Sequence, residues 1–253
     1  MNQHLSQEEN EQLAIVLKYL GAARIATYRN ACDGSNASSI ALYEWNLQLS
    51  AAFQEILLTL EVALRNAIDE QLSSWNQAQS GNTRNQGRSF TEDWIADPAI
   101  PLYGMTQDAL AEATRQANAA SGKRQRTHPR HRIPPTHDDI LAQISFGKWT
   151  ALMPYNYRGR PRGVEYKALW EEALFKAFSY APAGERGMRD VSSRLHRLHH
   201  LRNRVAHGEN ILSAEPEHRL IDALFLMKYI DPALGDWLMK ISRVRAVAKQ
   251  RPK

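Results

Sequence analysis

Cysteine is nearly absent from this chain of 253 residues, which contains only Cys32. A disulfide framework and a cysteine-rich zinc site are therefore excluded within one chain. The N-terminal stretch MNQHLSQEENEQL lacks the basic and apolar regions of a secretory signal peptide. No apolar run approaches the roughly 18 residues of a membrane span. These absences predict a cytoplasmic protein without a membrane segment.

Signals for β-sheet are also scarce. Alternating runs of Val, Ile and Thr are nearly missing, and glycine and proline are sparse outside a few stretches. Alanine, leucine, glutamate and arginine are abundant, and these residues favour helices. With 43% hydrophobic and 23% charged residues, the composition is globular. We therefore predict an all-α protein of about seven or eight helices.

Apolar periodicity and turn residues divide the chain into predicted helices and loops. The predicted helices span residues 5–30, 39–75, 106–121, 136–153, 164–180, 188–206, 213–229 and 232–247. The polar stretch 76–90 is predicted to bury nothing and to be mobile, and 121–135 is a second flexible loop. Thr136 and Asp139 form a capping-box signature. We expect an N-terminal helical segment (1–38), a main helical domain (39–230), and a C-terminal helix with a basic tail (231–253).

Positive charge is in modest excess, with a formal net charge of +5. It is concentrated in SGKRQRTHPRHR (121–132) and in the C-terminal tail, which fits a polyanionic partner such as RNA. The candidate RNA contacts in the loop are Lys123, Arg124, Arg126, Arg130 and Arg132. The alternative is that this charge only keeps a flexible loop soluble.

The tripeptide LRN occurs twice, and its second copy lies in HHLRNRVAHGENIL. Arg202, Asn203 and His207 supply a fixed cation, an amide and a titratable imidazole, which are the groups needed to cleave RNA without metal. Gly208 indicates that the helix ends at His207. On a regular helix Arg202 and His207 point roughly 140° apart. A broken helix end or a second subunit would be needed to bring them together.

The other readings of these residues are structural. Arg202 could pair with Glu61 or another acid, and His207 could simply cap the helix. Nearby, His199 is a candidate RNA contact. His196 and His200, four residues apart, could hold a metal, but no cysteine or glutamate completes such a pattern, and no metal site is predicted.

In the first copy, LEVALRNAIDEQL, no histidine follows. Glu61 and Arg65 are four residues apart on one helical face. We interpret Glu61 as a supporting partner of Arg202, and Arg65 as a support or phosphate contact. The alternative is a surface ion pair that contributes little.

LRNRVAHGENIL resembles the Arg-Asn-x-x-x-His motif of HEPN-domain ribonucleases. LEVALRNAIDEQL and DDILAQISFGKWTALM resemble the N-terminal and middle helices of the Abi-like (abortive infection) branch, and the three segments occur in the expected order within residues 40–230. The resemblance implies a HEPN-like helical bundle, here with additional helices, that dimerises through the motif-bearing helix. It also implies metal-independent RNA cleavage in defence or toxin systems, with Arg202, Asn203 and His207 as the catalytic residues.

These observations together predict a homodimeric endoribonuclease that needs no cofactor, acts on RNA, and has a neutralising antitoxin as a potential partner. The alternative is a non-catalytic HEPN-fold module that binds RNA or protein. A metal-dependent hydrolase is disfavoured because paired acids at ligand spacing are lacking.

Overall fold

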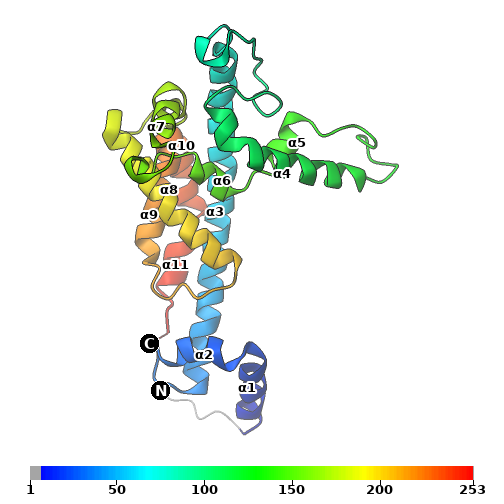
Figure 1. The fold of residues 1–253 in the computed structure, drawn as a ribbon. Coiled ribbons are helices and arrows are strands. Elements are labelled where there is room, and N and C mark those ends of the chain that lie inside the picture. Colours follow the sequence, from blue (N-terminus) through cyan, green and yellow to red (C-terminus); the bar gives the residue numbers. More distant parts are fainter. Residues whose placement is uncertain (1–6, 253) are drawn as a thin grey trace. The chain divides into compact units, whose positions relative to one another are not determined.

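Helices build the whole fold in the computed structural model, which describes residues 7–252 (Figure 1). Within these residues there are eleven α-helices, three 3₁₀ helices and no strand, so the all-α prediction is confirmed and the predicted number of helices was too low. In chain order the helices are α1 (Gln7–Leu20), α2 (Ala22–Arg29), α3 (Asn36–Ala78), η1 (Thr83–Asn85), α4 (Leu102–Gly122), α5 (His137–Leu141), α6 (Phe146–Ala151), η2 (Tyr157–Gly159), α7 (Gly163–Glu172), η3 (Leu174–Phe178), α8 (Gly184–Ala206), α9 (Pro216–Ile230), α10 (Pro232–Ile241) and α11 (Val244–Ala248).

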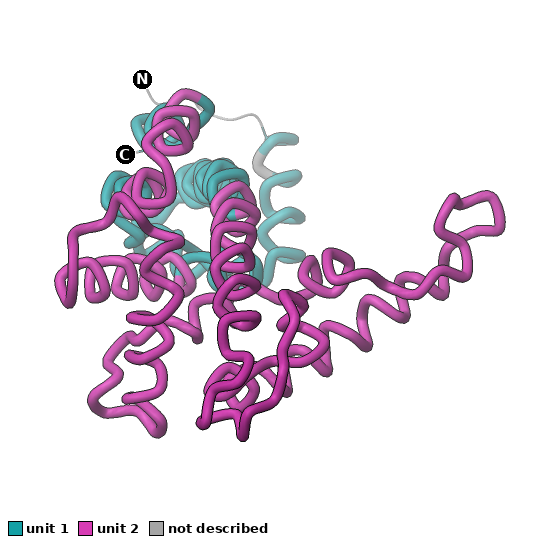
Figure 2. Tube along the Cα trace, turned by 90° about the horizontal axis from the view of Figure 1, so that it is seen from above, with its two compact units in different colours: residues 1–57, 201–221, 241–253 teal, residues 58–200, 222–240 magenta. Residues whose placement is uncertain are grey.

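The chain forms two compact units, each assembled from separate stretches (Figure 2). The first unit contains residues 1–57, 201–221 and 241–253, and the second contains 58–200 and 222–240. The division therefore falls within α3, α8 and α9 and does not follow the ends of these helices.

The first unit begins with two helices where the sequence predicted one. Gly21 has a φ of 88°, which a glycine adopts without strain and which interrupts a right-handed helix, so α1 ends at Leu20. Residues 5 and 6 of the predicted helix lie outside the described residues. Leu17, Ile25 and Ile40 then form a small apolar cluster that joins α1, α2 and the start of α3.

Side chains of α3 hold the C-terminal part of the chain within this unit. The indole Nε1 of Trp45 donates a hydrogen bond of 2.8 Å to the carbonyl of Val247 in α11. Arg251 lies over the Trp45 ring, with its guanidinium carbon 5.2 Å from the ring centroid. Glu55 of α3 accepts a hydrogen bond of 3.1 Å from Nε of Arg243. The end of the chain is thus fixed by one long helix.

In the second unit, α3 supplies the centre of the core. Its residues Leu60, Leu64, Ile68 and Leu72 are fully buried and follow one another at intervals of four, close to the 3.6-residue period of a helix. Trp94 and Trp149 are also fully buried and meet edge to face, with ring centroids 6.3 Å apart. The predicted helix over 39–75 is confirmed and extends a few residues further at each end.

By length and composition, α3 could also cross a membrane, because an 18-residue window in it has a mean hydropathy of 1.3. This corrects the expectation that no segment approaches a membrane span. Core helices of soluble proteins meet the same criterion, so a single such helix is weak evidence for a membrane.

The polar segment after α3 does not behave as predicted, because it buries several of its residues. Phe90 is 6% exposed, and the side chains of Asn76 and Asn85 are buried. The Asn76 amide donates to the carbonyls of Thr91 and Asp97, at 2.9 and 3.1 Å, and accepts from the amide of Ala99. Oδ1 of Asn85 likewise accepts from the amide of Ile100 at 2.8 Å, whereas its Nδ2 has no partner among the described residues. Backbone partners for most of the buried polar groups allow a sequence without an apolar stripe to fold inward.

The capping box at Thr136 and Asp139 is confirmed, and it begins α5. The helix predicted to follow it is shorter than expected. Ser145 adopts an extended conformation, with φ −72° and ψ 156°, and this separates α5 from α6. The helix predicted over 164–180 is also divided, into α7 and the 3₁₀ helix η3, and the helix predicted over 232–247 is divided into α10 and α11.

Candidate functional site

The Arg-Asn-x-x-x-His segment forms the C-terminal end of α8, within the first unit. The helix remains regular to its last turn, because the backbone amide of His207 donates to the carbonyl of Asn203 at 3.0 Å. Residues four apart on a regular helix share a face, so Asn203 and His207 lie on the same side. Arg202 points roughly 140° away from His207. The helix is not broken before His207, and within one chain it does not bring Arg202 and His207 together.

Gly208 ends the helix in the way that its position predicted. It has a φ of 62°, in the left-handed region. The amide of Gly208 donates to the carbonyl of Val205 at 3.1 Å, and the amide of Glu209 donates to that of Arg204 at 2.8 Å. This pair of bonds is a Schellman motif. It leaves His207 exposed at the C-terminus of α8.

The segment that follows His207 is fixed by three long polar side chains of the same unit. Nη1 of Arg24, in α2, donates to the carbonyl of Gly208 at 2.5 Å. Arg204 donates to the carbonyl of Asn210. The buried side chain of Asn46 accepts a hydrogen bond of 2.8 Å from the amide of Ile211. These contacts hold the backbone that follows His207, while the His207 side chain stays exposed.

The sequence does not predict these roles of Arg24, Asn46 and Arg204. Arg204 lies inside the motif segment and could have been noticed. Arg24 and Asn46 are 184 and 165 residues from their partners, so no local pattern points to them.

The proposed supporting residues Glu61 and Arg65 lie on α3 in the second unit. Both side chains are half-buried, which distinguishes them from an exposed surface pair. Nε of Arg65 is buried and has no hydrogen-bond partner among the described residues. A buried donor without a partner costs on the order of 1–3 kcal/mol. The pairing of Glu61 with Arg202 stays a prediction.

Two histidines earlier on α8, His196 and His199, contact aromatic rings in the second unit. The rings of Tyr155 and His196 stack with centroids 4.0 Å apart, and the Nε2 atoms of His196 and His200 are 3.3 Å apart. Burial and the nearby His200 lower the pKa of His196, so its imidazole is neutral at physiological pH. His199 is half-buried near Phe146, with ring centroids 6.3 Å apart.

Metal-binding geometry is not found at these histidines. Within residues 7–252, no group of three or more His, Cys, Asp or Glu side chains is arranged to hold a metal ion.

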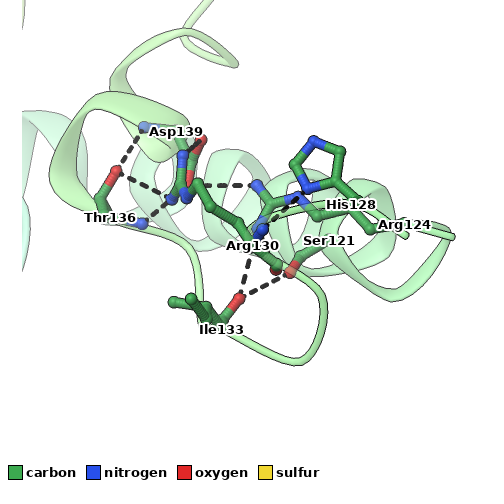
Figure 3. A network of polar contacts seen from close by, with 7 residues as sticks. All are labelled: Ser121, Arg124, His128, Arg130, Ile133, Thr136 and Asp139. Carbon is green, nitrogen blue, oxygen red and sulfur yellow. Dashed lines mark hydrogen bonds and ion pairs between the residues drawn. The ribbon is translucent and has the colours of Figure 1, made fainter. Parts of the chain in front are cut away.

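Several side chains of the basic loop between α4 and α5 form hydrogen bonds with one another and with the start of α5 (Figure 3), and the flexibility of the loop stays a prediction. Nη1 of Arg130 donates to Oδ1 of Asp139 at 3.0 Å, and Nη2 of Arg124 lies 3.4 Å from Oδ2 of the same residue. The hydroxyl of Ser121 donates to the carbonyl of Ile133 at 2.9 Å and closes the loop. The hydrogen bond from Arg130, with a further one from the backbone amide of Thr136, holds the pKa of Asp139 well below its usual range.

The five basic candidates in this loop therefore differ in role. Arg124 and Arg130 neutralise Asp139 and shape the loop. Lys123, Arg126 and Arg132 are exposed and have no ion-pair partner within residues 7–252. Within the second unit, α4 and this loop extend outward as an arm, with the loop at its tip (Figure 1).

The described residues form an all-α fold in which the Arg-Asn-x-x-x-His segment lies at the end of a long helix, with His207 exposed. Residues 18–213 match the family model described as Abi-like protein, and the chain belongs to this family. The matched residues include α2, all of α3, the basic loop and the complete motif segment. Searches among curated proteins and among solved structures gave no significant match.

Proposed function

We propose that this chain is a metal-independent endoribonuclease of the HEPN type that acts in abortive infection or a related defence response. The observation that carries the proposal is the arrangement of Asn203 and His207 on one face at the exposed end of α8, beside Arg202. Membership of the Abi-like family supports the defence role.

The reaction needs three functions that these side chains supply. The ribose 2′-oxygen attacks the adjacent phosphorus, and the bond from phosphorus to the 5′-oxygen of the next nucleotide breaks. His207 transfers protons, taking one from the 2′-hydroxyl or giving one to the leaving 5′-oxygen. Arg202 and Asn203 stabilise the negative charge on the phosphorane oxygens. The products are a 2′,3′-cyclic phosphate and a 5′-hydroxyl.

The angle between Arg202 and His207 leads to the second part of the proposal. Because a regular helix directs them roughly 140° apart, the site requires a second copy of the chain. We propose a two-fold dimer in which the α8 ends of both copies meet, so that Arg202 of one copy acts with His207 of its partner. Light scattering should show a dimer at micromolar concentration, and a monomer would count against this geometry.

Cleavage by purified protein tests the chemistry. In the presence of EDTA, wild type should cleave single-stranded RNA, and His207→Ala should lose at least 10²-fold in rate, the contribution typical of a general acid or base. His218→Ala is the matched control, since His218 is an exposed histidine of the same unit that lies outside the motif. It should retain full activity.

Wild type that cleaves no RNA, or His207→Ala that cleaves as well as wild type, would contradict the proposal. A chain that binds RNA without cleaving it would then be a non-catalytic binding module.

The basic loop would help to hold the RNA. Replacing Lys123, Arg126 and Arg132 with Gln should weaken RNA binding and flatten its dependence on salt by about 2 in log–log slope, for three cations at about 0.7 each. Arg124 and Arg130 should stay unchanged in this experiment because they pair with Asp139. An unchanged salt slope would leave the loop without a role in RNA binding.

Ribonuclease activity would also require a partner that neutralises the protein. A ribonuclease that acts on its own cell's RNA has to be held inactive until needed. We propose that a second protein supplies this control, and co-expression should reveal it as a factor that restores growth to cells producing wild type.

A further inference from the structure

Helix α8 has a second functional face in its N-terminal half, within the second unit. Arg186, Arg189, Ser193 and Arg197 follow one another at intervals of three and four, and at 100° per residue they fall within an arc of roughly 80°. The opposite side carries the fully buried Val191 and Leu195. A helix with one apolar side and one arginine-rich side buries the first in the core and presents the second at the surface.

A cleft of about 580 Å³ lies along this arginine-rich face. Four arginines of α8 line it, and Phe225 and Tyr229 of α9 form its other wall. Its size is within the range of small-ligand sites.

Two of the four arginines are held in place by two acids, the buried Asp222 and the half-buried Asp190. Asp222, only 3% exposed, accepts hydrogen bonds from Nε and Nη2 of Arg197 at 2.8 and 2.6 Å, and from Nη1 of Arg194 at 3.0 Å. Asp190 accepts a hydrogen bond of 3.0 Å from Nε of Arg194 and one of 2.5 Å from the Tyr229 hydroxyl. Arg194 and Arg197 are therefore rigid parts of the wall whose charge is balanced.

The other two arginines are available for a ligand. Arg186 and Arg189 are exposed, and neither has an ion-pair partner within residues 7–252. They are three apart on the helix, so their guanidinium groups can bind one anionic group or two adjacent ones. Planar, forked guanidinium groups match phosphate oxygens in geometry as well as charge.

An aromatic ring lies beside these cations. Phe225 is 42% exposed, which is unusual for a phenylalanine, and the guanidinium carbon of Arg194 lies 4.4 Å from its ring centroid. This cation–π contact holds the ring from one side. Basic grooves with an exposed aromatic ring bind nucleotides by pairing phosphate with arginine and stacking a base on the ring.

We propose that this cleft binds nucleotide phosphate groups, with Arg186 and Arg189 contacting the phosphate oxygens and Phe225 stacking against a base. The phosphate can come from an RNA strand or from a free mononucleotide. For RNA, the inference rests on the proposed function and adds a binding site distinct from the Arg202, Asn203 and His207 residues.

RNA binding is measured in a His207→Ala background, so that the strand stays intact, by fluorescence anisotropy of labelled single-stranded oligouridylate at several salt concentrations. Arg186→Gln with Arg189→Gln should weaken binding at least tenfold and flatten the salt dependence by about 1.4 in log–log slope. Phe225→Leu should weaken binding at least fivefold without changing the salt slope, because it removes stacking and no charge.

A charge-matched control separates the cleft from net charge. Lys18→Gln with Lys240→Gln removes the same charge from exposed positions outside the cleft. It should change affinity less than twofold. An equal loss in this control would overturn the proposal, since binding would then follow net charge alone.

The second arm of the experiment identifies the source of the phosphate. Thermal unfolding of wild type is followed with uridine monophosphate and with inorganic phosphate. Stabilisation by the mononucleotide that is lost in the double arginine variant would show that the cleft holds a free nucleotide. If the variant binds RNA more weakly and uridine monophosphate does not stabilise wild type, the cleft holds the RNA strand. If the variant changes neither measurement, the cleft does not bind nucleotides, and this result is independent of whether wild type cleaves RNA.

Discussion

Stability between pH 6.5 and 9 should depend on one histidine in the second unit. Nε2 of His137 lies 2.9 Å from Oδ1 of Asp69, and its Nδ1 lies 2.8 Å from Oδ1 of Asp93. The hydrogen bond to Asp69 raises the pKa of His137, burial lowers this pKa, and the hydrogen bond to Asp93 raises it. Together these effects raise the pKa from 6.5 to about 9. His137 is therefore a charged link between two carboxylates at neutral pH.

The magnitude follows from the two pKa values. A change from 6.5 to about 9 corresponds to about 3 kcal/mol, at about 1.4 kcal/mol per pH unit. The folded state binds this proton more tightly than the unfolded state. The stabilisation is thus complete below pH 6.5 and decreases as the pH rises through 9.

Urea unfolding of wild type and of His137→Gln at a series of pH values measures this contribution. The difference between the two free energies of unfolding should shrink by about 3 kcal/mol from pH 6 to pH 10. Asp69→Asn provides a second test, because an asparagine oxygen can still accept the 2.7 Å hydrogen bond from Nε1 of Trp94. It should lower the pKa of His137 as followed by NMR.

The control is His218→Gln, which removes an exposed histidine and should leave the pH profile unchanged. Parallel curves for wild type and His137→Gln would refute the reasoning. So would an NMR titration of His137 with a midpoint below 7.

Three further substitutions test contacts that the fold depends on, each by urea or thermal unfolding. Asn46→Ala should cost about 1–3 kcal/mol because it leaves the buried amide of Ile211 without an acceptor, and Asn46→Asp should restore most of the loss. Gly208→Ala should cost about 1 kcal/mol, since its φ of 62° is unfavourable for a residue with a Cβ, and no effect would argue against the Schellman end of α8. Asp222→Asn should cost about 3–5 kcal/mol by leaving two arginines beside a neutral group, and a change below 1 kcal/mol would contradict the buried charge network.

Periodicity in the sequence was sufficient for the longest elements. The apolar stripe of α3 predicted a helix and Gly208 predicted a helix end. Both features depend only on residues within a few positions in the sequence. The capping box at Thr136 belongs to the same group. Gly21 was not recognised as a break, because the apolar spacing of α1 and α2 fits one continuous helix and a single glycine can be tolerated inside one.

The motif residues Arg202, Asn203 and His207 were identified from the sequence because they lie together in a short segment with reactive groups. The spacing also indicated that one regular helix separates Arg202 from His207, and α8 remains regular to this point. The catalytic assignment, the dimer and the RNA substrate are still predictions.

Tertiary structure alone decided which polar residues are buried and which cations are available. Asn76 looked like part of a mobile loop, yet its amide meets backbone groups 15 to 23 residues away. In the sequence Arg130 is indistinguishable from the other cations of the loop, but in the structure it pairs with Asp139. The composition of the sequence determined the helices and the excess of positive charge. Whether a given arginine is neutralised or exposed depends on where its partner lies in the folded chain, because an ion pair forms only where the fold brings the two side chains together.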